Sequence, residues 1–187
     1  MTNKMTFTDS IDYIQKKIKD ILTKVSQEDI DQIKGLFLKS NRIFVYGAGR
    51  SGLVAKAFAI RLVHLGFQTF VIGETITAPV QKGDLVIIVS GSGETIPAVM
   101  TAEIAHKIGA SVVSITGKKS SEIAKFADIT LLISSFCDEE ERKKFAPLGT
   151  LFEASVWILL DGIIADLLDS KSETEESMRS RHATLEQ

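Results

Sequence analysis

The segment SGSGET, residues 90–95, concentrates groups that could bind an anion. It follows the apolar run 85–89 and carries three hydroxyl side chains together with two glycines. Glycines let the backbone approach a ligand closely, and a helix beginning near Thr95 would add unpaired amides and the positive end of its dipole. Glycine and serine also make ordinary strand-to-helix turns. Because the hydroxyls converge, we predict a compact terminal phosphate bound by Ser90, Gly91, Ser92, Gly93, Glu94 and Thr95.

A second glycine-rich segment, GAGRSG at residues 47–52, has the G-x-G-x-x-G spacing of a dinucleotide-binding turn. Glu74 falls near the distance expected of a ribose-binding carboxylate. A nicotinamide-dependent oxidoreductase is therefore an alternative hypothesis. It leaves SGSGET without a purpose and leaves no room for a distinct catalytic domain.

Short apolar runs rich in β-branched residues predict the strands that must position these segments. The runs span 43–46, 69–72, 85–89, 111–115 and 129–133. Helix-like segments lie between them at 51–65, 95–108 and 120–126. Strands that are apolar throughout are typical of sheets covered on both faces. The alternation predicts an α/β fold, a three-layer doubly wound sandwich with a five-stranded parallel sheet, whose ligands bind beyond the carboxyl ends of the strands.

The two ends of the chain have different patterns. Apolar residues at helical spacing predict a helical segment over 1–40, with a cap at Ser26 between two helices. After the last strand, an irregular stretch with the charge run DEEERKK leads to a long apolar helix at about 150–168. Apolar residues on more than one face of this helix indicate burial between subunits. A polar tail follows over 171–187.

Composition narrows the classes of protein. A chain of 187 residues can bury a sizeable core, and we predict one domain over 1–187. A net charge of -2 without basic clusters gives no indication of a nucleic-acid or acidic membrane partner. Cys137 is the single cysteine, so no internal disulfide or zinc spacing is predicted, and no metal. With no signal peptide or membrane-spanning run, we expect a cytoplasmic protein.

Several segments together resemble the sugar isomerase (SIS) domain family. They are VYGAGRSGLVAKAFAIRLVHLGF (45–67), VIGETITAP (71–79), SGSGET (90–95), APLGTLFE (146–153), LDGIIA (160–165) and RHATLE (181–186). SGSGET is generic to the family. GETITAP, APLGTLFE and RHATLE are more particular to the branch that isomerises 3-hexulose 6-phosphate.

This resemblance implies a cofactor-free interconversion of D-arabino-hex-3-ulose 6-phosphate and D-fructose 6-phosphate through an enediol. It implies action after a 3-hexulose-6-phosphate synthase in the ribulose monophosphate route for formaldehyde, and a homotetramer built as a dimer of dimers. It assigns the catalytic carboxylate to Glu153 and the phosphate to residues 90–95. By the same comparison, Gly47, Arg50 and Ser51 line the sugar side of the pocket.

Glu153 also has a purely structural interpretation. Residues 150–153, TLFE, match the capping box S/T-x-x-E, in which the glutamate reaches back to a backbone amide. An isomerase instead needs a carboxylate that shuttles one proton between neighbouring carbons, and donors for the enediol oxygens. Arg50, Ser51 or an imidazole could supply those donors.

The histidines differ in their surroundings. We expect a solvated role for His106 at a helix end and a packed, hydrogen-bonded role for His64. His182 stands in the polar tail. We hypothesise that the tail folds over an active site, of this or a neighbouring subunit, where His182 helps move protons between oxygens. A frayed terminus is the alternative.

Two further functions remain open within the resemblance. One is another sugar-phosphate isomerase, with arabinose 5-phosphate as the main competing substrate. The other is a non-catalytic phosphosugar sensor, since the same domain occurs in regulators. Such regulators usually carry a DNA-binding segment, whereas here no concentrated basic helix precedes the first strand.

Overall fold

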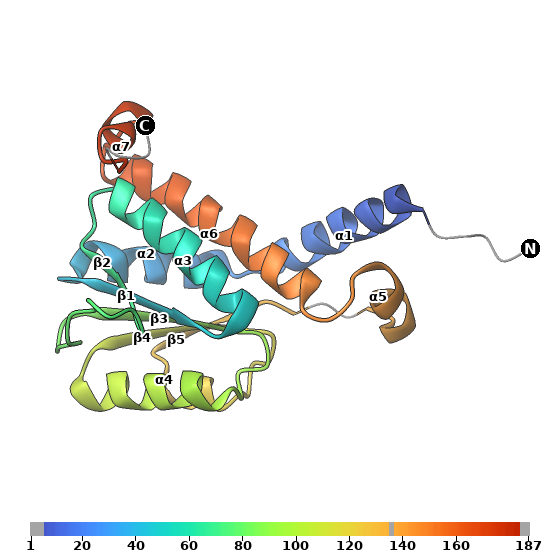
Figure 1. Cartoon of the computed structure of the whole chain (residues 1–187), viewed down its shortest axis with the longest axis horizontal. Helices are drawn as coiled ribbons and strands as arrows, with labels where there is room; N and C mark the ends of the chain where they lie inside the picture. The colour runs from blue at the N-terminus through green and yellow to red at the C-terminus, as the bar shows by residue number, and fades with distance from the viewer. Residues whose placement is uncertain (1–5, 135–136, 184–187) are drawn as a thin grey trace, which may run out of the picture.

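A five-stranded parallel sheet forms the centre of the described chain, which covers residues 6–134 and 137–183 of a computed structural model (Figure 1). Its strands are β1 (Ile43–Gly47), β2 (Thr69–Val71), β3 (Leu85–Ser90), β4 (Ser111–Thr116) and β5 (Ile129–Leu132). Their order is β2-β1-β3-β4-β5, and each neighbouring pair is parallel. The predicted α/β fold with a five-stranded parallel sheet is confirmed.

Helices cover both faces of this sheet (Figure 1). On one side lie α1 (Phe7–Leu22), α2 (Gln27–Lys39), α3 (Gly49–His64), α6 (Thr150–Ser170) and α7 (Glu175–Arg179). On the other lie α4 (Ile96–Ile108) and the 3₁₀ turn η1 (Ile123–Phe126). Along β1, Ile43 and Val45 pack toward the first group and Phe44 toward the second. This two-sided burial explains why the strands are apolar at successive positions.

Helix ends follow local chemistry, and one helix was missed. Ser26 caps α2 as predicted, its hydroxyl accepting from the Asp29 N–H. The charge run described as irregular instead forms α5 (Glu139–Phe145). Asp138 caps it, acids fill its first turn and bases its last, so the charges complement the helix dipole. The predicted helical segment at 120–126 is only the short 3₁₀ turn η1.

The strand order creates a switch point between β1 and β3. From β1 the chain passes through α3 to β2 on one side, whereas from β3 it passes through α4 to β4 on the other. Ligands of open α/β sheets bind at the carboxyl ends of the strands where the order reverses. Both glycine-rich segments lie there.

None of the helices in the described ranges is both long enough and apolar enough to cross a bilayer.

Candidate active site

The turn from β1 into α3 uses its glycines for close backbone packing. A Cβ on Gly47 would lie 2.7 Å from the Gly52 nitrogen, and one on Gly52 would lie 2.5 Å from the Gly47 carbonyl oxygen. Gly49 has a φ of 58°, a conformation that favours glycine. Ser51 is buried in the same turn, while the side chain of Arg50 projects outward and is 69% exposed.

Arg50 reaches the predicted catalytic carboxylate. Its Nε donates a hydrogen bond to Oε2 of Glu153. Glu153 lies in the first turn of α6, and only 12% of its side chain is exposed. The guanidinium therefore pairs with a carboxylate that is largely buried. An unpaired carboxylate in this position would carry a large desolvation cost. Two elements far apart in the sequence meet at this contact.

The β3–α4 loop gathers its hydroxyls around one point. Ser90 Oγ and Ser92 Oγ each lie 3.4 Å from Thr95 Oγ1. The Gly93 N–H donates to Ser90 Oγ and the Glu94 N–H donates to Ser92 Oγ, both at 3.2 Å. Thr95 is the N-cap residue of α4 but makes no side-chain cap bond, so the amide end of α4 can face an anion.

Gly93 must be glycine for two reasons. Its φ is 67°, and a Cβ there would lie 2.3 Å from Cβ of Ser121. The loop can therefore fold this tightly only without a side chain at this position. The side chain of Glu94 is exposed, and among the described residues no hydrogen bond or ion pair involves its carboxylate.

Phe152 lies between the β3–α4 loop and the Glu153 carboxylate. A Cβ on Gly91 would lie 3.1 Å from Cδ1 of Phe152, the residue just before Glu153. On the other side, the Gly117 N–H donates to the Gly91 carbonyl oxygen at 3.0 Å. Gly91 is thus held between α6 and the end of β4. Phe152 was not among the predicted site residues, although its place beside Glu153 in APLGTLFE could have indicated it.

The capping interpretation of Glu153 is wrong. The N-cap residue of α6 is Gly149, with no side-chain cap bond, and the Thr150 hydroxyl donates to the Pro147 carbonyl oxygen at 2.6 Å. A Cβ on Gly149 would lie 3.0 Å from Oε1 of Glu153. The glycine in APLGTLFE therefore makes room for the carboxylate. Just before it, Leu148 has a φ of 58° and its carbonyl oxygen accepts from Arg142 of α5.

Glu74, the residue that suggested a ribose contact, has another partner. Its Oε1 accepts from Nζ of Lys56 at 2.5 Å, and both side chains are about half exposed. The pair ties the loop after β2 to α3. Among the described residues, no group of three or more histidine, cysteine, aspartate or glutamate side chains could hold a metal ion.

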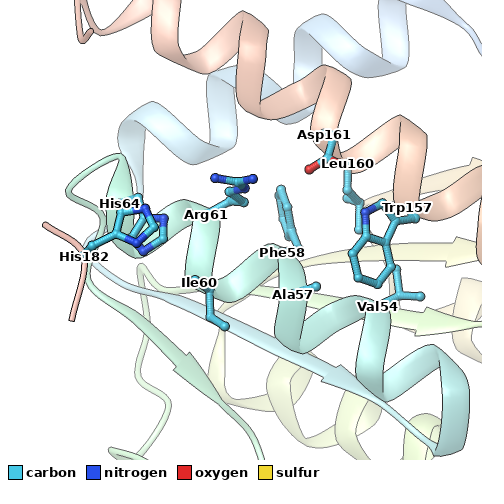
Figure 2. A pocket seen from close by; sticks show the side chains of 10 residues that line it. All are labelled: Val54, Ala57, Phe58, Ile60, Arg61, His64, Trp157, Leu160, Asp161 and His182. Carbon is cyan, nitrogen blue, oxygen red and sulfur yellow. The ribbon is translucent and has the colours of Figure 1, made fainter. Parts of the chain in front are cut away.

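His182 lies at the opposite end of α3 from Arg50. Its ring stacks on His64, with ring centroids 3.9 Å apart and planes 21° apart (Figure 2). Both rings border a cavity of about 300 Å³ between α3 and α6, which Arg61, Trp157 and Asp161 also line. At 1.5 Å per residue, the positions of Arg50 and His64 are about 21 Å apart along the helix. The structure therefore does not bring His182 to the Glu153 of its own chain.

The tail is held in place by an arginine next to His182. Arg181 Nη1 donates to the His64 carbonyl oxygen at 2.9 Å, and its guanidinium pairs with the Glu173 carboxylate at 2.9 and 3.0 Å. Hydrogen bonds from Arg181, and then from Ser177, hold the pKa of Glu173 below its usual value. The rest of the RHATLE motif, residues 184–186, lies outside the described residues.

The fold and this site match a known family. The SIS domain model matches residues 36–149, more than half of the chain. The chain therefore belongs to the SIS domain family, as its motifs predicted.

Two relatives and one solved structure are similar to this chain over most of its length. A 3-hexulose-6-phosphate isomerase of Bacillus subtilis is 37% identical over 185 residues, covering 97% of this chain and 100% of that protein. A 3-hexulose-6-phosphate isomerase of Methylomonas aminofaciens is 37% identical over 174 residues, covering 92% and 96%. A Methanococcus jannaschii protein, whose crystal structure infers a function of 3-hexulose-6-phosphate isomerase, aligns with a TM-score of 0.82 and 31% identity over 95% of this chain and 98% of that one.

Proposed function

We propose that the chain is a 3-hexulose-6-phosphate isomerase, which interconverts D-arabino-hex-3-ulose 6-phosphate and D-fructose 6-phosphate without a cofactor. The observation that carries the proposal is the meeting of a hydroxyl-rich anion loop, Ser90 to Thr95, with the Arg50–Glu153 pair at the sheet's switch point. The names of relatives at 37% identity support this substrate. In the cytoplasm, the enzyme would act after a 3-hexulose-6-phosphate synthase in the ribulose monophosphate route.

The reaction moves a carbonyl from C3 to C2 of an open-chain sugar. The loop at 90–95 binds the phosphate, and Glu153 removes the proton from C2 to give the 2,3-enediol. The same carboxylate then returns that proton to C3. A positioned base of this kind typically contributes about 10²- to 10⁴-fold to the rate. Atoms and electrons balance, because the only other change is transfer of a proton from the C2 hydroxyl to the oxygen on C3.

Arg50 serves two needs in this scheme. It balances the charge of Glu153, and its exposed guanidinium has further N–H groups that can donate to the enediol oxygens. Gly47 and Ser51 shape the turn that presents Arg50 to the sugar. The oxygens still need a group that exchanges protons with them at neutral pH, for which an imidazole is suited.

We assign that role to His182 of a second copy. Arg50, Leu53, Ala57, Ile60 and His64 follow one another on α3 at spacings of three and four residues, which is the pattern of a helix-packing seam. Leu53 and Ile60 are exposed apolar residues on this line. If two copies of α3 pack antiparallel about a two-fold axis near Ala57, the histidine pair of each copy meets Arg50 of the other. A homodimer would then hold two complete sites.

Mixing two inactive variants tests this sharing. Glu153→Gln and His182→Ala are purified separately, mixed in equal amounts under conditions that exchange subunits, and assayed. In each mixed pair, one site carries both defects and the other carries none. Random pairing should then restore about a quarter of the wild-type activity. If the mixture stays at the mean of the two variants, His182 does not act in trans.

A coupled assay tests the substrate. Formaldehyde and ribulose 5-phosphate are condensed by a hexulose-phosphate synthase, and fructose 6-phosphate is then measured with and without this chain, with Glu153→Gln as the control. We expect product only with the unmodified chain. Arabinose 5-phosphate is tested in parallel, because a higher kcat/KM for it would favour the alternative substrate. Tight binding of both sugars without turnover would instead support a sensor.

The phosphate loop is tested by Thr95→Val, which keeps the shape of the side chain and removes its hydroxyl. A hydrogen bond to a charged group contributes about 1.5–3 kcal/mol, so KM should rise roughly 10- to 100-fold with a smaller change in kcat. Thr101→Val is the matched control, because its hydroxyl donates to a carbonyl oxygen within α4 at 2.8 Å. An unchanged KM for Thr95→Val would remove the phosphate from this loop.

A further inference from the structure

Leu148 has an unusual backbone conformation close to the Glu153 carboxylate. Its φ is 58°, in the left-handed region that bulky residues seldom adopt. Its side chain is 89% exposed, so its own burial does not compensate for the strain. A single exposed leucine needs no explanation. A strained one beside a candidate active site does, because such strain persists only where the surroundings impose it.

Helix α5 is docked where it can position this residue. Figure 1 shows α5 beyond the carboxyl ends of the strands, at the end of the molecule where α6 begins. The ring of Phe145, the last residue of α5, stacks on Tyr13 of α1 with centroids 5.2 Å apart. The following Ala146 is fully buried. The chain that leads to Leu148 is therefore anchored to the body of the protein.

Two hydrogen bonds then fix the turn at Leu148. Nη1 of Arg142, in α5, donates to the Leu148 carbonyl oxygen at 3.1 Å. The Thr150 hydroxyl donates to the Pro147 carbonyl oxygen at 2.6 Å and so closes the turn around Leu148. Because the backbone is held on both sides, the point from which the leucine side chain projects is fixed.

That point is one residue from the surroundings of the proposed base. A Cβ on Gly149 would lie 3.0 Å from Oε1 of Glu153. Consecutive Cα atoms are about 3.8 Å apart, so a leucine side chain at 148 can reach a molecule bound at this carboxylate. Arg50 pairs with the other oxygen, Oε2. Leucine offers no hydrogen bond to sugar oxygens, so it suits the C–H surface of the carbon chain.

We propose that Leu148 packs on the carbon chain of the bound sugar and keeps water away from Glu153 while the enediol exists. Arg142 is then a positioning residue, which acts by holding the Leu148 carbonyl. The inference rests on the proposed isomerase function and adds a substrate-contacting residue to it. Water exclusion matters because a protonated Glu153 open to solvent would exchange its proton before returning it.

Isomerisation in D2O measures this exclusion. The hexulose phosphate is prepared in H2O and transferred to D2O with the enzyme. Glu153 takes the proton from C2 and returns it to C3, so a sheltered base leaves hydrogen at C3 of the product. An exposed base delivers deuterium there instead. The isotope content at C3 is read by mass spectrometry or NMR at low conversion.

Leu148→Asn is the informative variant. Asparagine is close to leucine in size, tolerates the left-handed conformation and is polar. The deuterium content at C3 should rise about twofold or more over wild type, because water then reaches the base. We expect kcat/KM to fall about tenfold, at the low end of the effect of one apolar contact in a substrate pocket. The melting temperature should not fall, since the replaced side chain is exposed.

Two control variants make the isotope readout specific. Leu148→Met keeps an apolar side chain and should retain the wild-type deuterium content. Leu38→Asn makes the same replacement at an exposed leucine of α2, which leads into the amino end of β1, and should also retain it. Equal deuterium content in Leu148→Asn and wild type would overturn the proposal. So would a wild-type product that is fully deuterated at C3.

Arg142→Gln tests the positioning role. Loss of the guanidinium releases the Leu148 carbonyl, so the deuterium content should rise, but less than in Leu148→Asn. Lys143→Gln, on the same helix and paired with Glu139 and Glu140, is the matched control. A purely structural Arg142 would lower the melting temperature without changing the isotope content, and that result would overturn its assignment.

A binding measurement makes the test independent of turnover. In leucine-methyl-labelled protein, the Leu148 resonance is assigned by its absence from Leu148→Asn. It should shift on addition of fructose 6-phosphate, whereas the Leu38 resonance should not. An active isomerase without this shift would overturn the contact and leave the proposed function standing. A shift without isomerase activity would support the contact and overturn the proposed reaction.

Discussion

The two ends of helix α3 hold different halves of the proposed chemistry. At its first turn, Arg50 contacts Glu153. The neighbouring Phe152 packs next to Gly91 of the anion loop, so the pair lies beside that loop. At its last turn, His64 stacks on His182, and both rings line a cavity together with Arg61. The first end is assembled by elements of one chain. The second end carries the histidine to which we assign proton transfer, so the proposed site needs two copies.

Loss of the carboxylate at the first end should have the largest effect. Glu153→Gln removes the base but keeps the size of the side chain, so kcat should fall by about 10²- to 10⁴-fold. Because Glu153 does not cap α6, the melting temperature should change little. Steady-state kinetics and thermal unfolding measure both quantities. If turnover is unchanged, Glu153 is not the base, and the two ends of α3 do not differ in the way proposed.

Arg50→Lys should have the next effect. Lysine keeps the positive charge but loses the planar set of N–H donors, so it cannot hold Glu153 and a substrate oxygen together. With one charged hydrogen bond lost, kcat/KM should fall roughly 10- to 100-fold. Lys56→Arg, on the same helix but paired with Glu74, is the control. A variant as active as wild type would leave Arg50 with only a packing role.

At the far end, His182→Ala should lower kcat by about 10²-fold, the lower part of the range for proton transfer. KM should change little, because the anion loop is intact. His106→Ala is the matched control, since that ring lies at the end of α4, tilted against Phe126. Full activity of His182→Ala would make the histidine pair structural.

Glu173 gives the smallest expected effect, through pH. Its pKa is lowered by Arg181, so its contribution to tail docking is present above the ordinary value of 4.5 and is lost as the pH falls through the lower folded value. The methyl resonance of the buried Met178 reports whether α7 is docked. In Glu173→Gln this resonance should lose its pH dependence in that window. An unaltered profile would show that other groups hold the tail.

The strands and both loops could be predicted because their signals are local. A parallel strand buried on both faces is apolar throughout, and a strand-to-helix turn needs glycine where backbones touch, as at Gly47 and Gly52. Helix α5 was harder to predict. Its charge run was described as irregular. However, acids followed by bases, after the cap residue Asp138, also suit the two ends of a short helix.

The stacking of His64 on His182 could not be predicted, because it depends on how the tail returns to α3. The two residues are 118 positions apart, and the contacts that return the tail involve Arg181, Glu173 and a backbone carbonyl. No local pattern encodes such a meeting. The capping box at Thr150 failed for a related reason, since the glutamate found a partner on another helix.

The length of helix α3 also fixes the separation and relative orientation of Arg50 and His64. It has 16 residues, with Arg50 in its first turn and His64 at its last position. Inserting one residue between them would rotate the far end by about 100° and lengthen the helix by about 1.5 Å. The histidines would then swing off the side that carries Arg50. Many single replacements along this helix should be tolerated, but a change in its length should not, so variation in chain length should be confined to the connecting loops.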